Sequence, residues 1–154
     1  MQIGVISDTH GLLRPEALAA LQGVDHILHA GDVGDFAILS QLRRIAPVTA
    51  IRGNIDNTGE CAKLPATDVV ELGDCLFYLV HSIDNLDLHP HAAGIGAVIT
   101  GHSHRPSIQW RDGVLYLNPG SAGLRRFSLP VTLARVHITN AHPEPEIISL
   151  LDHK

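Results

Sequence analysis

Residues 1–32, MQIGVISDTHGLLRPEALAALQGVDHILHAGD, alternate short apolar runs with a helix-like segment. The run at 1–7 is apolar and rich in β-branched residues, which is typical of a buried strand. Residues 14–21 favour a helix, because Pro15 suits a first helical turn. Residues 24–30 are strand-like again. This pattern predicts parallel strands joined by a covering helix.

The same alternation continues to residue 52. Residues 35–44, DFAILSQLRR, predict a second helix, with Asp35 as its N-cap and two arginines in its last turn. Residues 47–52, PVTAIR, predict a third strand. The opening third of the chain therefore indicates a β-α-β-α-β unit, whose strands form a parallel sheet.

The second half of the chain has a different character. Residues 67–72 and 75–80 are strand-like runs separated by a Gly-Asp pair, which predicts a hairpin. Residues 84–93 are irregular or briefly helical. Further strands are expected at 95–100, 106–110, 114–118, 131–138 and 145–151, with turns at 111–113 and 140–145. Together the two halves indicate two packed sheets with helices outside.

Length and composition indicate one globular domain spanning residues 1–154. The chain is 45% hydrophobic and 18% charged, which is ordinary for a soluble protein with its own core. The net charge of −5 argues against general nucleic-acid binding, because phosphate backbones are held by a basic excess. An acidic surplus is also compatible with bound divalent cations.

The cysteines and the amino terminus bear on the cell compartment in which we expect the protein. Cys61 and Cys75 are too few for a disulfide framework and too far apart for a CxxC motif. The amino terminus lacks a basic segment and a long apolar run, so we expect no signal peptide, and no stretch is long enough to span a membrane. We therefore expect a cytoplasmic protein with reduced thiols.

Polar side chains follow five of the predicted strands at the point where each strand ends. Ligands of open α/β sheets lie beyond the carboxyl ends of the strands, so neighbouring strands would bring these side chains to one rim. Glycines in three of the turns permit a close approach of the backbone there. The residues so placed are Asp8, His10, Asp32, Asn54, His81, His102 and His104.

This set of side chains has the chemistry of a metal site. Imidazoles, carboxylates and an amide oxygen, without a thiolate, suit Mn²⁺, Zn²⁺, Fe²⁺, Ni²⁺ or Mg²⁺. The seven residues exceed the needs of one tetrahedral ion and suit two ions that share a carboxylate. Two ions about 3.5–4 Å apart can activate a water and stabilise charge on a phosphoryl group.

Each position taken alone also has a structural explanation. Asp8 could cap a helix, Asp32 and Asn54 could be turn residues, and His81 could be a buried core histidine. We favour the metal site because all five strand ends carry such residues together. His26 and His29 lie within a predicted strand, where packing is the better explanation. The remaining histidines, expected at the surface or in loops, are His89, His91, His137, His142 and His153.

The ordered set DTH (8–10), GD (31–32), GN (53–54), His81 and GHSH (101–104) resembles the calcineurin-like metallophosphoesterases. The longer matches SDTHG, HAGDV, RGNID, TGHSH and NPGS resemble the small single-domain phosphodiesterases of that superfamily, from residue 3 to about residue 125. The resemblance implies a four-layer α/β/β/α sandwich, in which two packed mixed sheets are flanked by helices.

The resemblance also implies roles for individual residues. A hydroxide bridging two metal ions would attack the phosphorus of a small phosphate ester, most readily a phosphodiester. We expect Mn²⁺, with Zn²⁺, Fe²⁺, Ni²⁺ or Mg²⁺ as alternatives, and family members often form homo-oligomers. The first ion would bind Asp8, His10, Asp32 and His104; the second would bind Asp32, Asn54, His81 and His102. The residues expected to act in catalysis are Asp8, Asp32, Asn54 and His102.

Two positions depart from the family pattern. Many members carry a histidine directly after the GN asparagine, where it assists departure of the leaving group, and this chain has Ile55. A positioned acid typically contributes about 10²–10⁴-fold, so we expect slow turnover or a good leaving group. A second histidine is often found two residues after the one equivalent to His81, and here that position is Ile83, followed by Asp84.

Other polar residues and two other functions stay open at this stage. Asp56 either orients a ligand or closes a turn, and Asn118 and Ser121 either lie near phosphate or form a structural turn. Arg125 and Arg126 either contact an anionic substrate or form a solvated charge pair. A non-catalytic interaction scaffold is one alternative function, for which a retromer subunit resembling this family is the precedent. A phosphomonoesterase is the other, although the missing histidine after Asn54 weighs against it.

Overall fold

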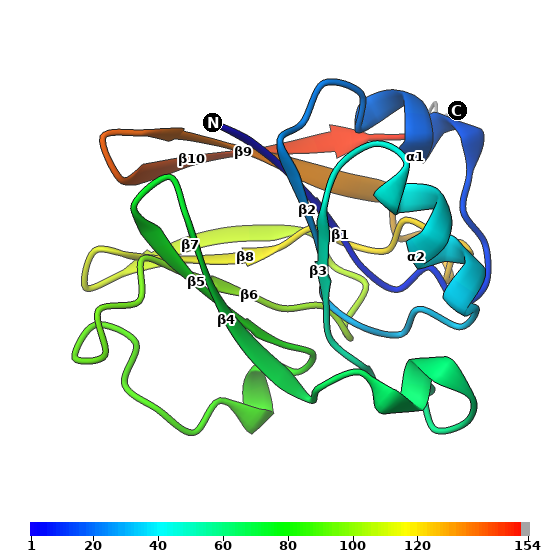
Figure 1. Cartoon of the computed structure of the whole chain (residues 1–154), viewed down its shortest axis with the longest axis horizontal. Helices are drawn as coiled ribbons and strands as arrows, with labels where there is room; N and C mark the ends of the chain where they lie inside the picture. Colours follow the sequence, from blue (N-terminus) through cyan, green and yellow to red (C-terminus); the bar gives the residue numbers. More distant parts are fainter. Residues whose placement is uncertain (152–154) are drawn as a thin grey trace.

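The computed structural model describes residues 1–151, so the expectation for His153 lies outside the described part of the chain. Two five-stranded mixed sheets pack face to face (Figure 1). The first sheet has the strand order β10-β9-β1-β2-β3. Its strands are β1 (Gln2–Ile6), β2 (His26–His29), β3 (Val48–Ala50), β9 (Thr132–Thr139) and β10 (His142–Ser149).

The opening β-α-β-α-β unit is confirmed. Strands β1, β2 and β3 are parallel, and the helices α1 (Pro15–Ala20) and α2 (Phe36–Arg43) connect them. The Asp35 carboxylate caps α2 by accepting a hydrogen bond of 2.9 Å from Ala37 N. Within residues 1–151 no helix is long and apolar enough to cross a membrane.

The second sheet has the order β4-β5-β6-β8-β7. Strands β5, β6 and β8 are parallel, while β4 and β7 pair antiparallel at the two edges. The hairpin of β4 and β5 has the predicted boundaries. The strands are β4 (Thr67–Leu72), β5 (Cys75–Val80), β6 (Ala97–Ile99), β7 (Ser107–Arg111) and β8 (Val114–Asn118). A short 3-10 helix, η1 (Glu60–Lys63), precedes β4.

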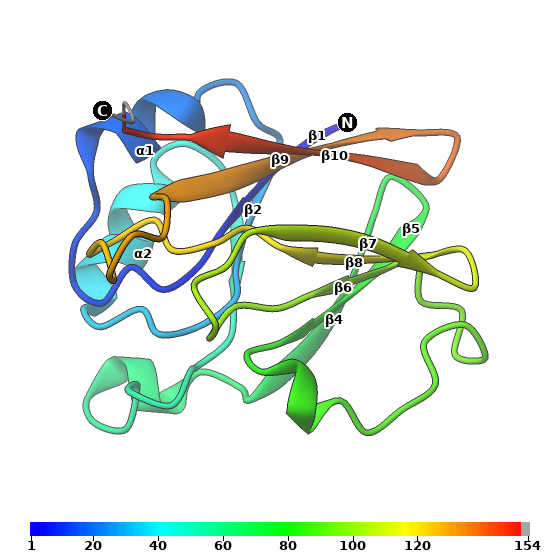
Figure 2. The same ribbon diagram turned by 180° about the vertical axis from the view of Figure 1, so that it is seen from behind.

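Three layers of apolar side chains hold the sheets together. Between the sheets, Ile3 and Val5 of β1 pack into one buried cluster with Phe77 and Leu79 of β5. The opposite face of the first sheet is covered by α1 and α2. The outer face of the second sheet is covered by a largely irregular segment, residues 81–95, which contains the 3-10 helix η2 (Ile83–Asn85) (Figure 2). The predicted layered sandwich is therefore confirmed, with a mostly irregular fourth layer.

The turn predicted at 140–145 is shorter than expected. Only Asn140 and Ala141 form it, both with positive φ, as in a two-residue hairpin turn. Pro143 and Pro145 lie inside β10, which is an edge strand. Because the two prolines are two residues apart, their nitrogens face the same side of the strand, and an edge strand tolerates proline on its unpaired side.

The carboxyl ends of strands from both sheets meet at one rim. The turns after β1, β2 and β3 come from the first sheet, and the segments after β5 and β6 come from the second. At Gly101, after β6, an added Cβ would collide with Ser7 Oγ and lie 2.7 Å from Asp8 Oδ2. The rim is therefore formed between two sheets rather than along one, and its close approach requires glycine.

The turns after β1 and β2 also touch, which makes Gly34 sensitive to substitution. A Cβ at Gly34 (φ +87°) would collide with Gly11 N and lie 2.6 Å from the His10 carbonyl carbon, whereas a Cβ at Gly23 (φ +83°) meets nothing within 4 Å. We expect Gly23→Ala to lower the unfolding free energy by about 1 kcal/mol through backbone strain alone. Gly34→Ala should cost about 2 kcal/mol more, because backbone must move.

Urea denaturation of the two variants measures this difference. Equal losses of unfolding free energy in Gly34→Ala and Gly23→Ala would show that the two turns do not pack as described.

Candidate metal centre

Two buried carboxylates define the centre of the rim. Asp8 follows β1 and Asp32 follows β2, and their side chains are 0% and 4% exposed. Among the described residues neither carboxylate pairs with a lysine or arginine, and their ion-pair partners are histidines alone. Burying two negative charges without a permanent counter-charge is costly, so this position favours bound cations.

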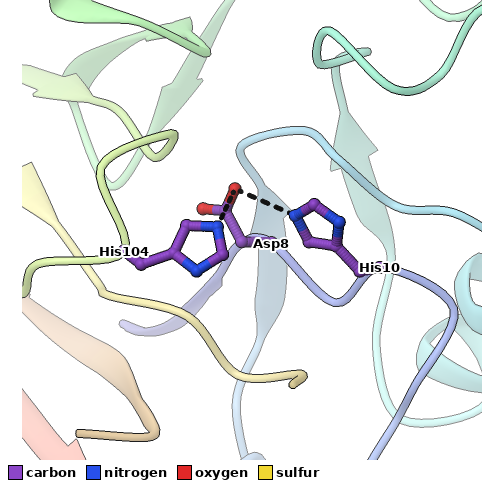
Figure 3. Close-up of side chains that lie close together, drawn as sticks. All are labelled: Asp8, His10 and His104. Atoms are coloured by element: carbon purple, nitrogen blue, oxygen red, sulfur yellow. Dashed lines mark ion pairs between the residues drawn. The ribbon is translucent and has the colours of Figure 1, made fainter. Parts of the chain in front are cut away.

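One group of side chains surrounds Asp8. Asp8, His10 and His104 each offer a ligand atom, and these atoms lie within 4.8 Å of one another. Asp8 Oδ1 is 3.8 Å from His10 Nε2 and 3.4 Å from His104 Nε2. Figure 3 shows the two imidazoles on opposite sides of the carboxylate, each turned toward it. The three side chains could hold one metal ion.

A second group is formed by Asp8, Asp32 and His81, whose ligand atoms also lie within 4.8 Å of one another. His81 Nε2 is 3.2 Å from Asp32 Oδ2 and 3.8 Å from Asp8 Oδ1. Its other nitrogen, Nδ1, lies 2.7 Å from the Ala30 carbonyl oxygen and donates to it. That bond fixes the proton on Nδ1 and leaves the Nε2 lone pair facing the carboxylates, as in metal-binding histidines.

Asp32 lies between the two groups. Its Oδ2 is 3.3 Å from His10 Nε2 and 3.2 Å from His81 Nε2, and its Oδ1 accepts a hydrogen bond of 3.0 Å from Ile55 N. The Ile55 amide thus holds the carboxylate in place through one oxygen. The other oxygen is in reach of both groups, which is the geometry that a shared ligand requires.

Asn54 and His102 complete the rim. One terminal atom of the Asn54 side-chain amide lies 3.2 Å from both Asp32 carboxylate oxygens and 3.1 Å from His81 Nε2. Without a cation this atom is the amide nitrogen, which donates to these acceptors, whereas a cation bound among them would be faced by the amide oxygen. His102 is exposed, with its ring centroid 5.3 Å from that of His81. Of the seven predicted residues, five lie in the two close groups and these two adjoin them.

The backbone at the rim is strained. Among residues 1–151, ten non-glycine residues have positive φ, and five of them belong to the predicted site. L-residues rarely adopt this conformation, and it persists only where the surrounding structure imposes it. The strain is therefore concentrated where it directs side chains to the centre. The five residues are Asp8 (φ 56°), His10 (φ 47°), Asp32 (φ 55°), His102 (φ 72°) and His104 (φ 63°).

Hydrogen bonds satisfy one oxygen of Asp8 and leave the other free. Oδ2 accepts from Ser7 Oγ at 2.8 Å and from His102 N at 3.1 Å. Oδ1 and His10 Nε2 are buried and have no hydrogen-bond partner. Buried polar atoms without partners call for an explanation, and a divalent cation between them supplies one. The residues present thus fit a metal ion in both charge and donor type.

Asp56, which the sequence left open, links two turns of the rim. Its carboxylate accepts hydrogen bonds from the backbone N–H groups of Val33 at 3.0 Å, Gly34 at 3.0 Å and Gly53 at 2.9 Å. The turn that carries Asp32 is thereby tied to the turn that carries Asn54. Asp56 is a supporting residue that holds the turns carrying these candidate ligands in place.

Asn118 has a similar supporting role in the second sheet. Its Nδ2 donates to Gly101 O at 2.9 Å and to Ser103 Oγ at 3.1 Å, so it braces the GHSH turn. Ser121 Oγ donates to the Asp8 carbonyl at 3.1 Å. The NPGS segment therefore serves as a structural brace, which is one of the two explanations that the sequence allowed.

His29 lies outside both groups. It is fully buried, and its Nδ1 accepts from Gly31 N at 3.1 Å while Nε2 lies 3.1 Å from Thr9 Oγ1. Burial lowers the pKa of His29 to about 4, so the ring is neutral at physiological pH. Packing, as expected from the sequence, accounts for this residue.

The charges at the centre are coupled. Burial alone would raise the pKa of Asp8, but the nearby imidazoles of His10 and His104 outweigh it, and the pKa lies well below its usual range. The pKa of Asp32 is likewise lowered, because its bond to His81 outweighs burial. The carboxylate of Asp8 beside it raises the pKa of His10, and at His81 the neighbouring Asp32 carboxylate overcomes the effect of burial and raises the pKa. Without metal, the carboxylates are ionised and these imidazoles retain protons to higher pH.

Comparison with known proteins adds an independent line of evidence. The model of the calcineurin-like phosphoesterase superfamily domain matches residues 1–141. A probable metallophosphoesterase of Methanocaldococcus jannaschii is 37% identical over 142 residues, which cover 84% of this chain and 72% of that protein. A phosphodiesterase of the same organism is 29% identical over 141 residues, which cover 78% of this chain and 83% of that protein.

Solved structures share the fold. A predicted phosphoesterase from Streptococcus pneumoniae has a TM-score of 0.76 and 25% identity, covering 97% of this chain and 89% of that one. Vps29 from Entamoeba histolytica, in complex with Zn²⁺, has a TM-score of 0.73 and 21% identity, covering 98% of this chain and 100% of that one. The second likeness shows the fold alone.

The coupled charges predict opposite pH dependences with and without metal. Above pH 6.5 the metal-free protein should lose unfolding free energy as pH rises, because His10 and His81 hold more protons folded than unfolded. His29, whose pKa is about 4, stays neutral when folded with or without metal, so its contribution is the same in both conditions and cancels from their comparison. With Mn²⁺ bound, the imidazoles of His10 and His81 stay neutral when folded and take up protons only on unfolding, so the unfolding free energy should instead rise with pH up to about pH 7.5.

Urea unfolding between pH 6.5 and 8.5, with a chelator or with Mn²⁺, measures the slope of unfolding free energy against pH for the metal-free and the metal-bound protein. His10→Gln should reduce the slope of the metal-free protein, and His89→Gln, at an exposed site outside the centre, should leave it unchanged. Identical slopes with and without metal would contradict the coupling.

Proposed function

The chain belongs to the calcineurin-like phosphoesterase superfamily, and we propose that it hydrolyses phosphodiesters with two divalent metal ions held at the rim between its sheets. The observation that carries this proposal is the position of Asp8 Oδ1. It is buried without a hydrogen-bond partner and lies within 3.8 Å of the Nε2 atoms of His10, His81 and His104.

We assign seven residues to the two ions. When bound, two such ions would lower the pKa of a water and neutralise charge on a phosphoryl group. The oxygen and nitrogen donors suit Mn²⁺, which we propose as the metal. The first ion would be held by Asp8, His10, Asp32 and His104, and the second by Asp32, Asn54, His81 and His102.

The protein's own residues orient these groups. The Ile55 amide fixes one oxygen of Asp32 and leaves Oδ2 between His10 and His81. The Ala30 carbonyl fixes the ring of His81. His102 is the exposed histidine of the set, so it borders the space from which a phosphate ester would enter. Preorganised groups of this kind need no rearrangement during the reaction.

The position after Asn54 bears on the substrate. Ile55 is 38% exposed, and its side chain cannot donate a proton to a departing alkoxide. Esters whose leaving groups are stable as anions are then favoured. A relative named as a phosphodiesterase supports a diester as substrate. We therefore propose a diester with a good leaving group rather than an unactivated phosphomonoester.

Measuring the metal content and the hydrolytic activity of the same protein preparation tests the proposed two-metal site. Protein loaded with Mn²⁺ should contain two ions per chain and hydrolyse bis(p-nitrophenyl) phosphate. Asp32→Ala should lower kcat/KM by about 1,000-fold or more, because it removes the ligand shared by both ions. Asp112→Ala is the matched control, because Asp112 (φ 52°) has the same backbone strain as Asp32 (φ 55°) in a remote hairpin turn.

His102→Ala should also abolish hydrolysis while leaving the fold intact, as checked by circular dichroism. Metal-loaded protein that hydrolyses neither activated diesters nor monoesters would contradict the proposal and favour an interaction scaffold.

Dependence on the leaving group tests the role of Ile55. Across a series of aryl phosphodiesters, kcat/KM should fall steeply as the pKa of the leaving phenol rises, because no side chain protonates it at position 55. Ile55→His should raise kcat/KM for the poorest leaving groups by about 10²-fold and leave the best ones little changed.

Val69→His is the control, because Val69 is an exposed apolar residue (47%) on β4. A flat dependence in the unmodified protein would indicate that another group already supplies the proton.

A further inference from the structure

Phe127, in the segment between β8 and β9 (yellow to orange in Figure 2), carries two unfavourable features at once. Its side chain is 91% exposed, the largest exposure among the large hydrophobic residues of the described chain. Its backbone has a φ of 54°, which bulky side chains rarely adopt. Both features are costs to the folded protein, and such costs tend to be retained where a residue serves function.

The residues directly before Phe127 border the candidate metal centre. Leu124, Arg125 and Arg126 line a cavity of about 190 Å³ together with His10 and His104. Both histidines are proposed ligands of the first ion. The cavity thus lies between two arginines and the candidate metal centre, and Phe127 follows Arg126 in the chain. Arg125 also donates from Nε to Leu129 O at 3.3 Å within the loop.

The loop is anchored to the ligand-bearing turns. Ser121 Oγ donates to the carbonyls of Asp8 at 3.1 Å and of Leu124 at 3.3 Å. Arg14 Nε donates to Gly123 O at 3.0 Å. These bonds join the start of the loop to the turn after β1. The backbone that carries Arg125 and Arg126 is therefore held next to the turn after β1.

The lining of this cavity is positively charged, although the chain as a whole carries a net negative charge. The net charge of the protein is −5, yet the described lining of this cavity contains two arginines and no acidic residue. Such a cavity attracts an anion. Guanidinium groups and an aromatic ring also share a second property, since both stack on planar π systems such as nucleobases.

We propose that residues Leu124–Phe127 form a subsite for a nucleoside-type substituent of the substrate, with Arg126 beside the phosphate and Phe127 stacked on the base. This inference rests on the proposed function of the neighbouring centre. It makes the substrate a phosphodiester whose retained group carries an aromatic heterocycle, with Leu124, 58% exposed, as an added apolar contact.

A larger cleft borders the other side of the centre and differs in chemistry. Its volume is about 350 Å³, and its lining includes His102, Gln109, Arg111 and Tyr116. The Arg111 guanidinium lies over the Tyr116 ring, 5.3 Å from its centroid, so one face of that ring is already covered. This polar cleft suits the opposite substituent of the diester, and it supplies the comparison for the test.

Two p-nitrophenyl diesters with the same leaving group provide the experiment. Thymidine 5′-(p-nitrophenyl phosphate) carries a base, and ethyl p-nitrophenyl phosphate does not. With Mn²⁺-loaded protein, kcat/KM should be higher for the thymidine ester. Phe127→Ala and Arg126→Gln should each lower the ratio of the two values by about fivefold or more, and Phe127→Tyr should retain it.

Two variants serve as controls. Arg111→Gln changes the larger cleft, and Trp110→Ala removes another partly exposed aromatic side chain (44%), which lies on β7 and stacks on His142. Neither substitution should change the ratio of kcat/KM for the thymidine ester to kcat/KM for the ethyl ester. An unchanged ratio in both Phe127→Ala and Arg126→Gln overturns the proposal, and so does a fall in the ratio for Arg111→Gln alone. A dimer in sedimentation experiments that Phe127→Ala dissociates also overturns it, because a second copy would then cover the ring.

A binding measurement separates this inference from the proposed function. If the protein hydrolyses neither diester, the proposed function fails, and calorimetric titration with thymidine 5′-phosphate and ethyl phosphate then tests the subsite alone. Tighter binding of thymidine 5′-phosphate that Phe127→Ala abolishes supports the subsite. Equal affinity for the two phosphates overturns it.

Discussion

The paired negative charge of Asp8 and Asp32, buried where two sheets meet, is the constraint on which the rest of the rim depends. Removing an ionised carboxylate from water costs several kcal/mol unless partners compensate. Here the partners are imidazoles, whose charge is lost as pH rises. Ser7, Asp56 and the backbone amides fix the geometry but add no positive charge. Cation binding at this rim would therefore be thermodynamically linked to folding.

Much of the fold could be predicted because its strands are short apolar runs that end in distinctive turns. Strands β4, β5 and β8 have the predicted boundaries, and β1 to β3 form the predicted parallel unit. Sequence periodicity does not determine which strands pair over long distances. Two packed sheets and an ion shared by Asp8 and His104 were expected from the sequence and its family resemblance, but the strand order within each sheet, and the position of the rim between the sheets, required the three-dimensional structure.

The supporting residues were harder to predict than the candidate ligands. Asp56 has the sequence surroundings of an ordinary turn residue, yet two of its three amide donors come from a turn more than twenty residues away. Asn118 likewise contacts the GHSH turn across neighbouring strands. Pro143 was predicted in a turn because edge and interior strands cannot be distinguished locally. In each case the deciding partner is distant in sequence.

The left-handed conformation of five rim residues has a consequence for the evolution of the fold. Each of these positions would gain about 1 kcal/mol if glycine replaced the native side chain, and at Asp8 or Asp32 the change would also remove a buried charge. A lineage released from selection for hydrolysis could therefore become more stable once the two buried carboxylates were lost, because the histidines would then have no buried charge to compensate. The architecture would persist without the chemistry, and the vacated rim would be free to acquire protein contacts.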